Sequence, residues 1–151
     1  MDGEDLESSV GEDNCFFIAI GDDVAFYRLL FKYVPDGSTM FIEGVLDHGT
    51  KTFETLKAYE THDDMKVVLG TQWPKDPVIK IKLSRKNKPK LLELFKRPGF
   101  GADFMHQHIY KDGKFFFSSY DTLDDIWIRK NLIPEKVLEQ AVNDKIIMIN
   151  N

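Results

Sequence analysis

The chain has 151 residues with a formal net charge of −5, and 42% of them are hydrophobic, which suffices for one domain with a sizeable core. A single cysteine, Cys15, excludes an intramolecular disulfide and a cysteine-based metal cluster, and it favours a reducing compartment. No apolar run reaches the ~20 residues that span a bilayer, and the N-terminus lacks a signal-peptide pattern, so we expect a cytoplasmic protein with no membrane partner.

Charge is distributed unevenly along the chain. Residues 1–13 hold six acids and no base, so we expect a disordered acidic tail before a single domain over 14–151. Residues 75–97 hold nine basic residues and two acids, a local charge of +7. Clustered Lys and Arg can bind nucleic acid or another polyanion, although most charge runs are only solvated surface. The candidate binding residues in this segment are Lys80, Lys82, Arg85, Lys86, Lys88 and Lys90.

The first predicted element is a buried strand over 15–20, and the next segment, 24–34, fits two structures. Two aspartates just before it can cap a helix. The turn signal Pro35-Asp36-Gly37 and the strand pattern that follows favour instead a hairpin of 26–34 with 38–46. We expect the hairpin.

The middle of the chain continues with strands and one helix. Residues 51–60 fit a strand or a short helix equally well. Strands are predicted over 65–69 and 78–83, and in the second of these Ile and Leu alternate with Lys, so one face is buried. Residues 87–97 carry a helical apolar stripe with a proline near the first turn.

The most informative segment is a predicted β-hairpin around the two-residue turn signal Asp112-Gly113. With this turn as the loop, His108 faces Phe117 and His106 faces Ser119 across the hairpin. Cross-strand partners share a face of the sheet. The polar residues on that shared face are therefore His106, His108, Ser119 and Asp121.

Two helices and a strand are predicted at the end of the chain. Acidic residues can cap a short helix over 122–130, and a proline opens another over 134–143. Residues 146–149 fit a final strand or an extended tail. The predicted fold is a single α+β domain with a largely antiparallel sheet and two or three helices, the last two C-terminal.

The His-x-His pair is the strongest candidate for a chemical site. Two imidazoles on one strand face can bind zinc or iron, and Asp121 opposite them can supply a carboxylate ligand. The strongly aromatic surroundings fit His106 and His108 as packing residues even better. Ser119 with His106 and Asp121 has the residue types of a hydrolytic triad but lacks a nucleophile elbow. Cys15 has no basic neighbour to activate its thiol.

No catalytic arrangement in the sequence is specific, so we expect a binding function. The leading hypothesis is a small protein-interaction domain of the inhibitor or immunity type, with another protein as its partner and no cofactor. The first alternative is a metal-binding protein or metal-dependent enzyme that uses the hairpin histidines. The second alternative is polyanion binding through 75–97.

Overall fold

The computed structural model describes residues 13–45, 54–61, 78–120 and 122–150. Within them, one antiparallel sheet has the strand order β3-β2-β4-β5-β6-β1-β7. Its strands are β1 (Cys15–Ile20), β2 (Ser38–Val45), β3 (Val78–Leu83), β4 (Phe104–Lys111), β5 (Lys114–Tyr120), β6 (Asp125–Arg129) and β7 (Ile147–Ile149).

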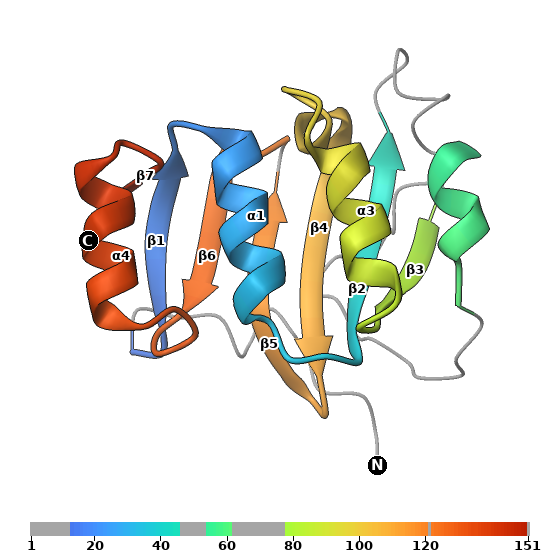
Figure 1. Ribbon diagram of the computed structural model, residues 1–151, viewed down its shortest axis with the longest axis horizontal. Helices are drawn as coiled ribbons and strands as arrows, with labels where there is room; N and C mark the ends of the chain where they lie inside the picture. Colours follow the sequence, from blue (N-terminus) through green and yellow to red (C-terminus); the bar gives the residue numbers. More distant parts are fainter. Residues whose placement is uncertain (1–12, 46–53, 62–77, 121, 151) are drawn as a thin grey trace.

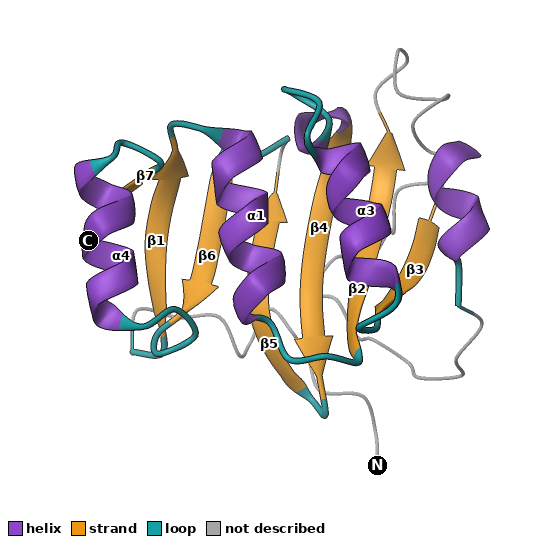
Figure 2. Ribbon diagram, in the orientation of Figure 1, coloured by secondary structure: helices purple, strands orange, loops and turns teal. Residues whose placement is uncertain are grey.

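Three α-helices cover one face of this sheet (Figure 1): α1 (Asp23–Tyr33), α3 (Asn87–Phe95) and α4 (Glu135–Asn143). The segregation of helices to one face of an antiparallel sheet confirms the predicted α+β fold (Figure 2). The predicted strand over 65–69 lies outside the described residues, as does the predicted acidic tail apart from Asp13.

Several local patterns gave the correct element. In β3, Ile79, Ile81 and Leu83 are buried and alternate with half-buried residues, as the period-two pattern requires. The predicted strands over 15–20, 38–46 and 146–149 correspond to β1, β2 and β7, and the helices over 87–97 and 134–143 correspond to α3 and α4. In the undecided segment 51–60, the described residues 54–59 are helical and end in the 3₁₀ turn η2 (Lys57–Tyr59).

The predicted hairpin of 26–34 with 38–46 is wrong, because the first segment is helix α1. Asp22 caps this helix: its Oδ1 accepts a hydrogen bond from the Ala25 N–H at 3.1 Å. The buried residues of α1 follow helical spacing and face the sheet. They are Phe26, Tyr27, Leu30 and Phe31.

The predicted helix over 122–130 is also wrong, and so is the expectation of two C-terminal helices there. Thr122 and Leu123 have φ values of 57° and 69°, which reverse the chain in a turn. The chain then continues as β6, which pairs with β5 and with β1. Ile126 and Ile128 are buried and alternate with half-buried neighbours, which is the pattern of a strand.

Aromatic packing between the helices and the sheet forms the centre of the core. The Tyr27 ring lies 4.4 Å from the Phe95 ring, so it joins α1 to α3. Its hydroxyl donates a 2.6 Å hydrogen bond to Gln107 Oε1 on β4. Burial raises the pKa of Tyr27, and the phenol stays protonated. Gln107 Nε2 donates in turn to the Gly101 carbonyl at 2.6 Å in the 3₁₀ turn η3 (Gly101–Asp103), so this polar chain is fixed at both ends.

Candidate functional site

The hairpin histidines lie on the sheet face opposite the helices. Ile109 belongs to the core beneath the helices, and side chains alternate along β4, so His106 and His108 point the other way. Three residues on the neighbouring strands β2 and β5 complete a buried or half-buried polar group with them. We call this group the hairpin cluster: Glu43, His106, His108, Ser118 and Tyr120.

A β-bulge changes the register that the turn predicts. Asp112 and Gly113 both have positive φ, which confirms the two-residue turn, and Tyr110 faces Phe115 as expected. The pairing then shifts by one residue next to Ile109, so His108 faces Ser118 rather than Phe117. One extra residue in a strand moves every later side chain to the other face, which the turn signal alone does not reveal.

Contacts within the hairpin cluster are close. The His108 Nδ1 and Ser118 Oγ atoms lie 2.8 Å apart, at hydrogen-bonding distance. The Tyr120 ring contacts both imidazoles, with centroids 5.2 Å from His108 and 5.6 Å from His106. Glu43 is directly opposite His106 on β2 and is fully buried. These contacts make the cluster a packed part of the sheet.

Burial sets the chemistry of His108. Desolvation of its fully buried ring, followed by the proximity of His106, lowers the pKa of His108 from 6.5 to about 3. The ring is therefore neutral near pH 7, and its Nε2 makes no hydrogen bond among the residues that the structure describes. A group that keeps one protonation state near neutral pH is poorly matched to general acid–base catalysis.

The bulge separates two of the residues that have the types of a hydrolytic triad, Ser119 and His106. Ser119 faces Gln107 and lies on the helix-covered side, across the sheet from His106. Asp121 lies outside the described residues. Within the described part of the chain, no group of three or more His, Cys, Asp or Glu residues is placed to hold a metal ion, so zinc or iron binding by His106, His108 and Asp121 stays a prediction.

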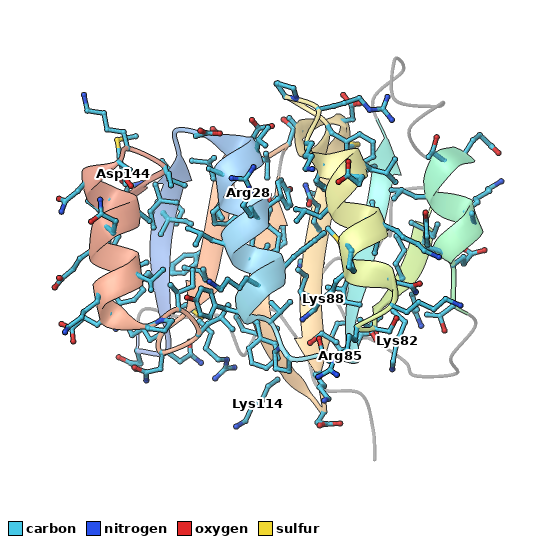
Figure 3. All side chains as sticks on the ribbon, in the orientation of Figure 1. Arg28, Lys82, Arg85, Lys88, Lys114 and Asp144 are labelled. Atoms are coloured by element: carbon cyan, nitrogen blue, oxygen red, sulfur yellow. The ribbon has the colours of Figure 1, made fainter. Side chains whose placement is uncertain are left out.

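The basic segment does not form one surface. Lys80 and Lys82 are half-buried and point to the face without helices, because they alternate with the buried residues of β3. Lys88 lies at the helix layer instead, where its Nζ donates to the Val34 carbonyl at 2.5 Å and pairs with Asp36 at 2.8 Å. Arg85, which is labelled beside Lys88 in Figure 3, has its Nε 3.6 Å from the same Asp36.

Two of the six candidate cations are thus partly neutralised by one carboxylate, and Lys88 lowers the pKa of Asp36 through a hydrogen bond and charge. Lys86 and Lys90 are exposed at the start of α3 and along it. Polyanion binding by this segment stays a prediction.

An apolar surface at the other end of the sheet was missed by the sequence reasoning. Among the described residues, the exposed large hydrophobic side chains are Val142, Met148 and Ile149, all on α4 and β7 or at their ends. A groove of about 420 Å³ lies beside them. Its lining residues are Phe16, Glu135, Leu138, Glu139, Val142, Asn143 and Ile149. We call this groove together with Met148 the α4–β7 surface.

Two signals in the sequence could have indicated this surface. The apolar stripe of α4 contacts the core through Ala141, which is buried. Leu138 and Val142 make this stripe wider than that contact requires. The run Ile146-Ile147-Met148-Ile149 also lacks the polar alternation of a strand with one wet face. Neither signal shows that this strand lies at the edge of the sheet.

Comparisons with known proteins found no matching family model, no matching curated protein and no matching solved structure. No helix within the described residues is long and apolar enough to cross a membrane.

Proposed function

We propose that this chain is a protein-interaction domain that binds its partner at the α4–β7 surface. The observation that carries the proposal is the concentration of Val142, Met148 and Ile149 at one end of the sheet, where Met148 is 55% exposed. Exposed apolar side chains gathered at one end of a domain in this way mark an interaction site more often than singly scattered ones do. The half-exposed rim of such a surface excludes water once a partner covers it.

An inhibitor or immunity-type role is one form of this function. Such a protein acts by occupying a surface of its partner, so it needs a complementary surface and no reacting groups. The neutral, packed state of His108 fits a domain whose buried polar residues stabilise the sheet. Cys15 is a buried residue outside any disulfide, which supports a cytoplasmic setting for the interaction.

The test is capture of a partner by the full chain and by two variants with matched charge. Met148→Asp places a charge in the α4–β7 surface, whereas Arg28→Gln changes the net charge equally on the exposed side of α1 (Figure 3). We expect the wild-type chain and Arg28→Gln to retain the same partner and Met148→Asp to lose it. Urea unfolding of all three checks that each chain is folded.

Two results would contradict the proposal. A partner retained equally by Met148→Asp would place the contact elsewhere on the molecule. A chain that retains no partner at all under conditions that preserve its fold would remove the interaction function itself.

A further inference from the structure

Basic residues from separate parts of the chain meet at one end of the sheet. Cys15 at the start of β1 pairs with Arg129 at the end of β6. The Lys130 N–H donates to the Asn14 carbonyl at 2.9 Å. Arg129 Nε donates to the Phe115 carbonyl at 2.7 Å. The start of β1, the end of β6 and the start of β5 therefore lie side by side.

The same end continues to the turns that flank β2 and β3. Lys111 pairs with Lys114 across the β4–β5 turn, and its Nζ donates to the Asp36 carbonyl at 2.9 Å. Arg85 Nε lies 3.6 Å from the Asp36 carboxylate. Figure 3 shows Lys82, Arg85 and Lys114 toward this end of the sheet. We call the cations that meet here the basic end: Lys82, Arg85, Lys86, Lys88, Lys111, Lys114, Arg129 and Lys130.

The fold assembles the basic end, because half of its residues lie outside the basic segment 75–97. Strand pairing brings the β4–β5 turn and the end of β6 to the residues that follow β3. Lys86 and Lys114 are exposed, and the Arg85 side chain is 94% exposed. Several of these charges can therefore reach a ligand at the surface.

Asp36 indicates which ligand suits the basic end. Its carboxylate pairs with Lys88 Nζ at 2.8 Å, and the two nearby cations lower the pKa of this surface carboxyl group. The other described acids at this end are Asp13 and Asp112, and the cations outnumber them. Further carboxylates would therefore be attracted to the same place.

Residues 1–12 join the domain at the basic end. Through Asp13 they lead to Asn14, whose carbonyl accepts the hydrogen bond from Lys130. They contain five acidic residues and neither lysine nor arginine. The acids are Asp2, Glu4, Asp5, Glu7 and Glu12. The charge of this segment is thus complementary to that of the surface beside its attachment point.

The length of residues 1–12 suffices to cross the basic end. Five strand spacings separate β1 from β3, which is about 24 Å at roughly 4.8 Å per spacing. Twelve residues can span up to about 40 Å. A ligand on so short a tether acts at an effective concentration on the order of 1 mM, so weak charge pairing is enough for occupancy.

We propose that the acidic segment 1–12 binds across the basic end of its own molecule and competes there with acidic ligands. This contact is independent of whether the α4–β7 surface binds a partner. Nucleic acid is a poorer occupant, because lysine predominates among the cations and Asp36 and Asp112 would face the phosphates.

The first experiment places a paramagnetic label on the full chain at Ser8→Cys. Cys15 is fully buried, so the label attaches at position 8. At low salt we expect the amide signals of Arg85 and Lys114 to broaden much more than those of Arg28 and Asp144. Salt at roughly 0.5 M should remove most of this difference, because it screens exposed charges. Dilution should leave the broadening unchanged, because the contact is within one molecule.

The matched control keeps the length of the segment and removes its charge. This neutral-segment variant carries Asp2→Asn, Glu4→Gln, Asp5→Asn, Glu7→Gln and Glu12→Gln. With the same label, it should lose the preference for Arg85 and Lys114 and show no salt dependence. The comparison separates charge pairing from the mere closeness of the attachment point.

The second experiment measures competition with a labelled octaglutamate peptide at low salt. We expect the neutral-segment variant to bind this peptide at least about tenfold more tightly than the wild-type chain does. Lys114→Glu in the neutral-segment variant should weaken binding several-fold. Arg28→Glu makes the same change of charge on the exposed side of α1 and should weaken it less. Urea unfolding checks that every chain is folded.

Four outcomes would overturn the inference. Equal broadening patterns for the charged and neutral segments would exclude charge pairing, and broadening that fades on dilution would place the segment on a second copy. Equal binding of octaglutamate by the wild-type chain and the neutral-segment variant would mean that residues 1–12 do not occupy the basic end. A thymidine octanucleotide that binds more tightly than octaglutamate would identify nucleic acid as the occupant.

Discussion

Acid should destabilise this protein through His108, and the size of the effect follows from burial of the ring. The folded-state pKa of His108 is about 3, whereas the unfolded chain has the ordinary value of 6.5. Between these values the unfolded state binds the proton and the folded state does not, so stability falls as pH falls. Well below both values the whole shift would correspond to about 5 kcal/mol, at roughly 1.4 kcal/mol per pKa unit.

The useful window is pH 7 to pH 5, above the ordinary range of most carboxyl groups. Across it, His108 in the unfolded chain goes from roughly one-quarter protonated to almost fully protonated, while the folded protein keeps it neutral. The free energy of unfolding should therefore drop by about 2 kcal/mol on account of this residue alone.

The assay is urea unfolding at pH 7, 6 and 5 for wild type and His108→Gln, which cannot titrate. The substitution also has a cost in stability that does not depend on pH. This cost cancels when the change in unfolding free energy between pH 7 and pH 5 is taken for each chain, so the difference between the two changes is due to His108. Ser118→Ala is the matched control: it removes the 2.8 Å contact but keeps the ring buried, so it should keep the wild-type profile. If His108→Gln is too unstable, His108→Phe offers a non-titrating ring of similar shape.

One result would refute this reasoning. Parallel pH profiles for wild type and both His108 variants would mean that the ring accepts a proton in the folded state at the ordinary pH. His108 would then be accessible to water, and the packed description of the hairpin cluster would be wrong.

Three further predictions concern the core and the surface. Tyr27→Phe should lower the free energy of unfolding in urea by about 1–3 kcal/mol, because Gln107 Oε1 loses its buried donor. Tyr33→Phe, at a half-buried position, should lower it less. Equal losses would contradict the role of the hydrogen bond. Gly101→Ala should lower the melting temperature by several degrees, about 1–3 kcal/mol, because the added methyl group would overlap the Tyr27 side chain; an unchanged melting temperature would show that this site is not tightly packed. In carboxyl titrations by NMR, Lys88→Gln should raise the pKa of Asp36 toward its ordinary value and Arg85→Gln should raise it less, since Lys88 is the larger cause of its lowering; the reverse order would contradict the pairing.

The sequence predicted elements whose signal is local. Alternation in 78–83 and the Asp112-Gly113 turn depend on neighbouring residues, and both are confirmed. The helix stripe in 87–97 is likewise a short-range pattern, and it corresponds to α3. Propensity and periodicity were enough at these positions because no competing pattern is present.

Prediction failed where two local signals competed. The residues of α1 are strongly apolar and aromatic, which suits strand and helix alike, and packing of Tyr27 against Phe95 decides the helix. At the start of β6 the acidic residues resemble a helix cap, but positive φ at Thr122 and Leu123 turns the chain. Neither residue type normally signals that conformation.

The sequence by itself determined that this is one α+β chain with a buried core, a basic segment, and after that segment a β-hairpin carrying two histidines. Only the tertiary structure decided what those residues face. A single bulge paired His108 with Ser118, and the strand order placed β7 at the edge of the sheet, beside the groove. The reason is physical: strand register and sheet order depend on contacts between residues far apart in the chain, and local patterns contain no information about them.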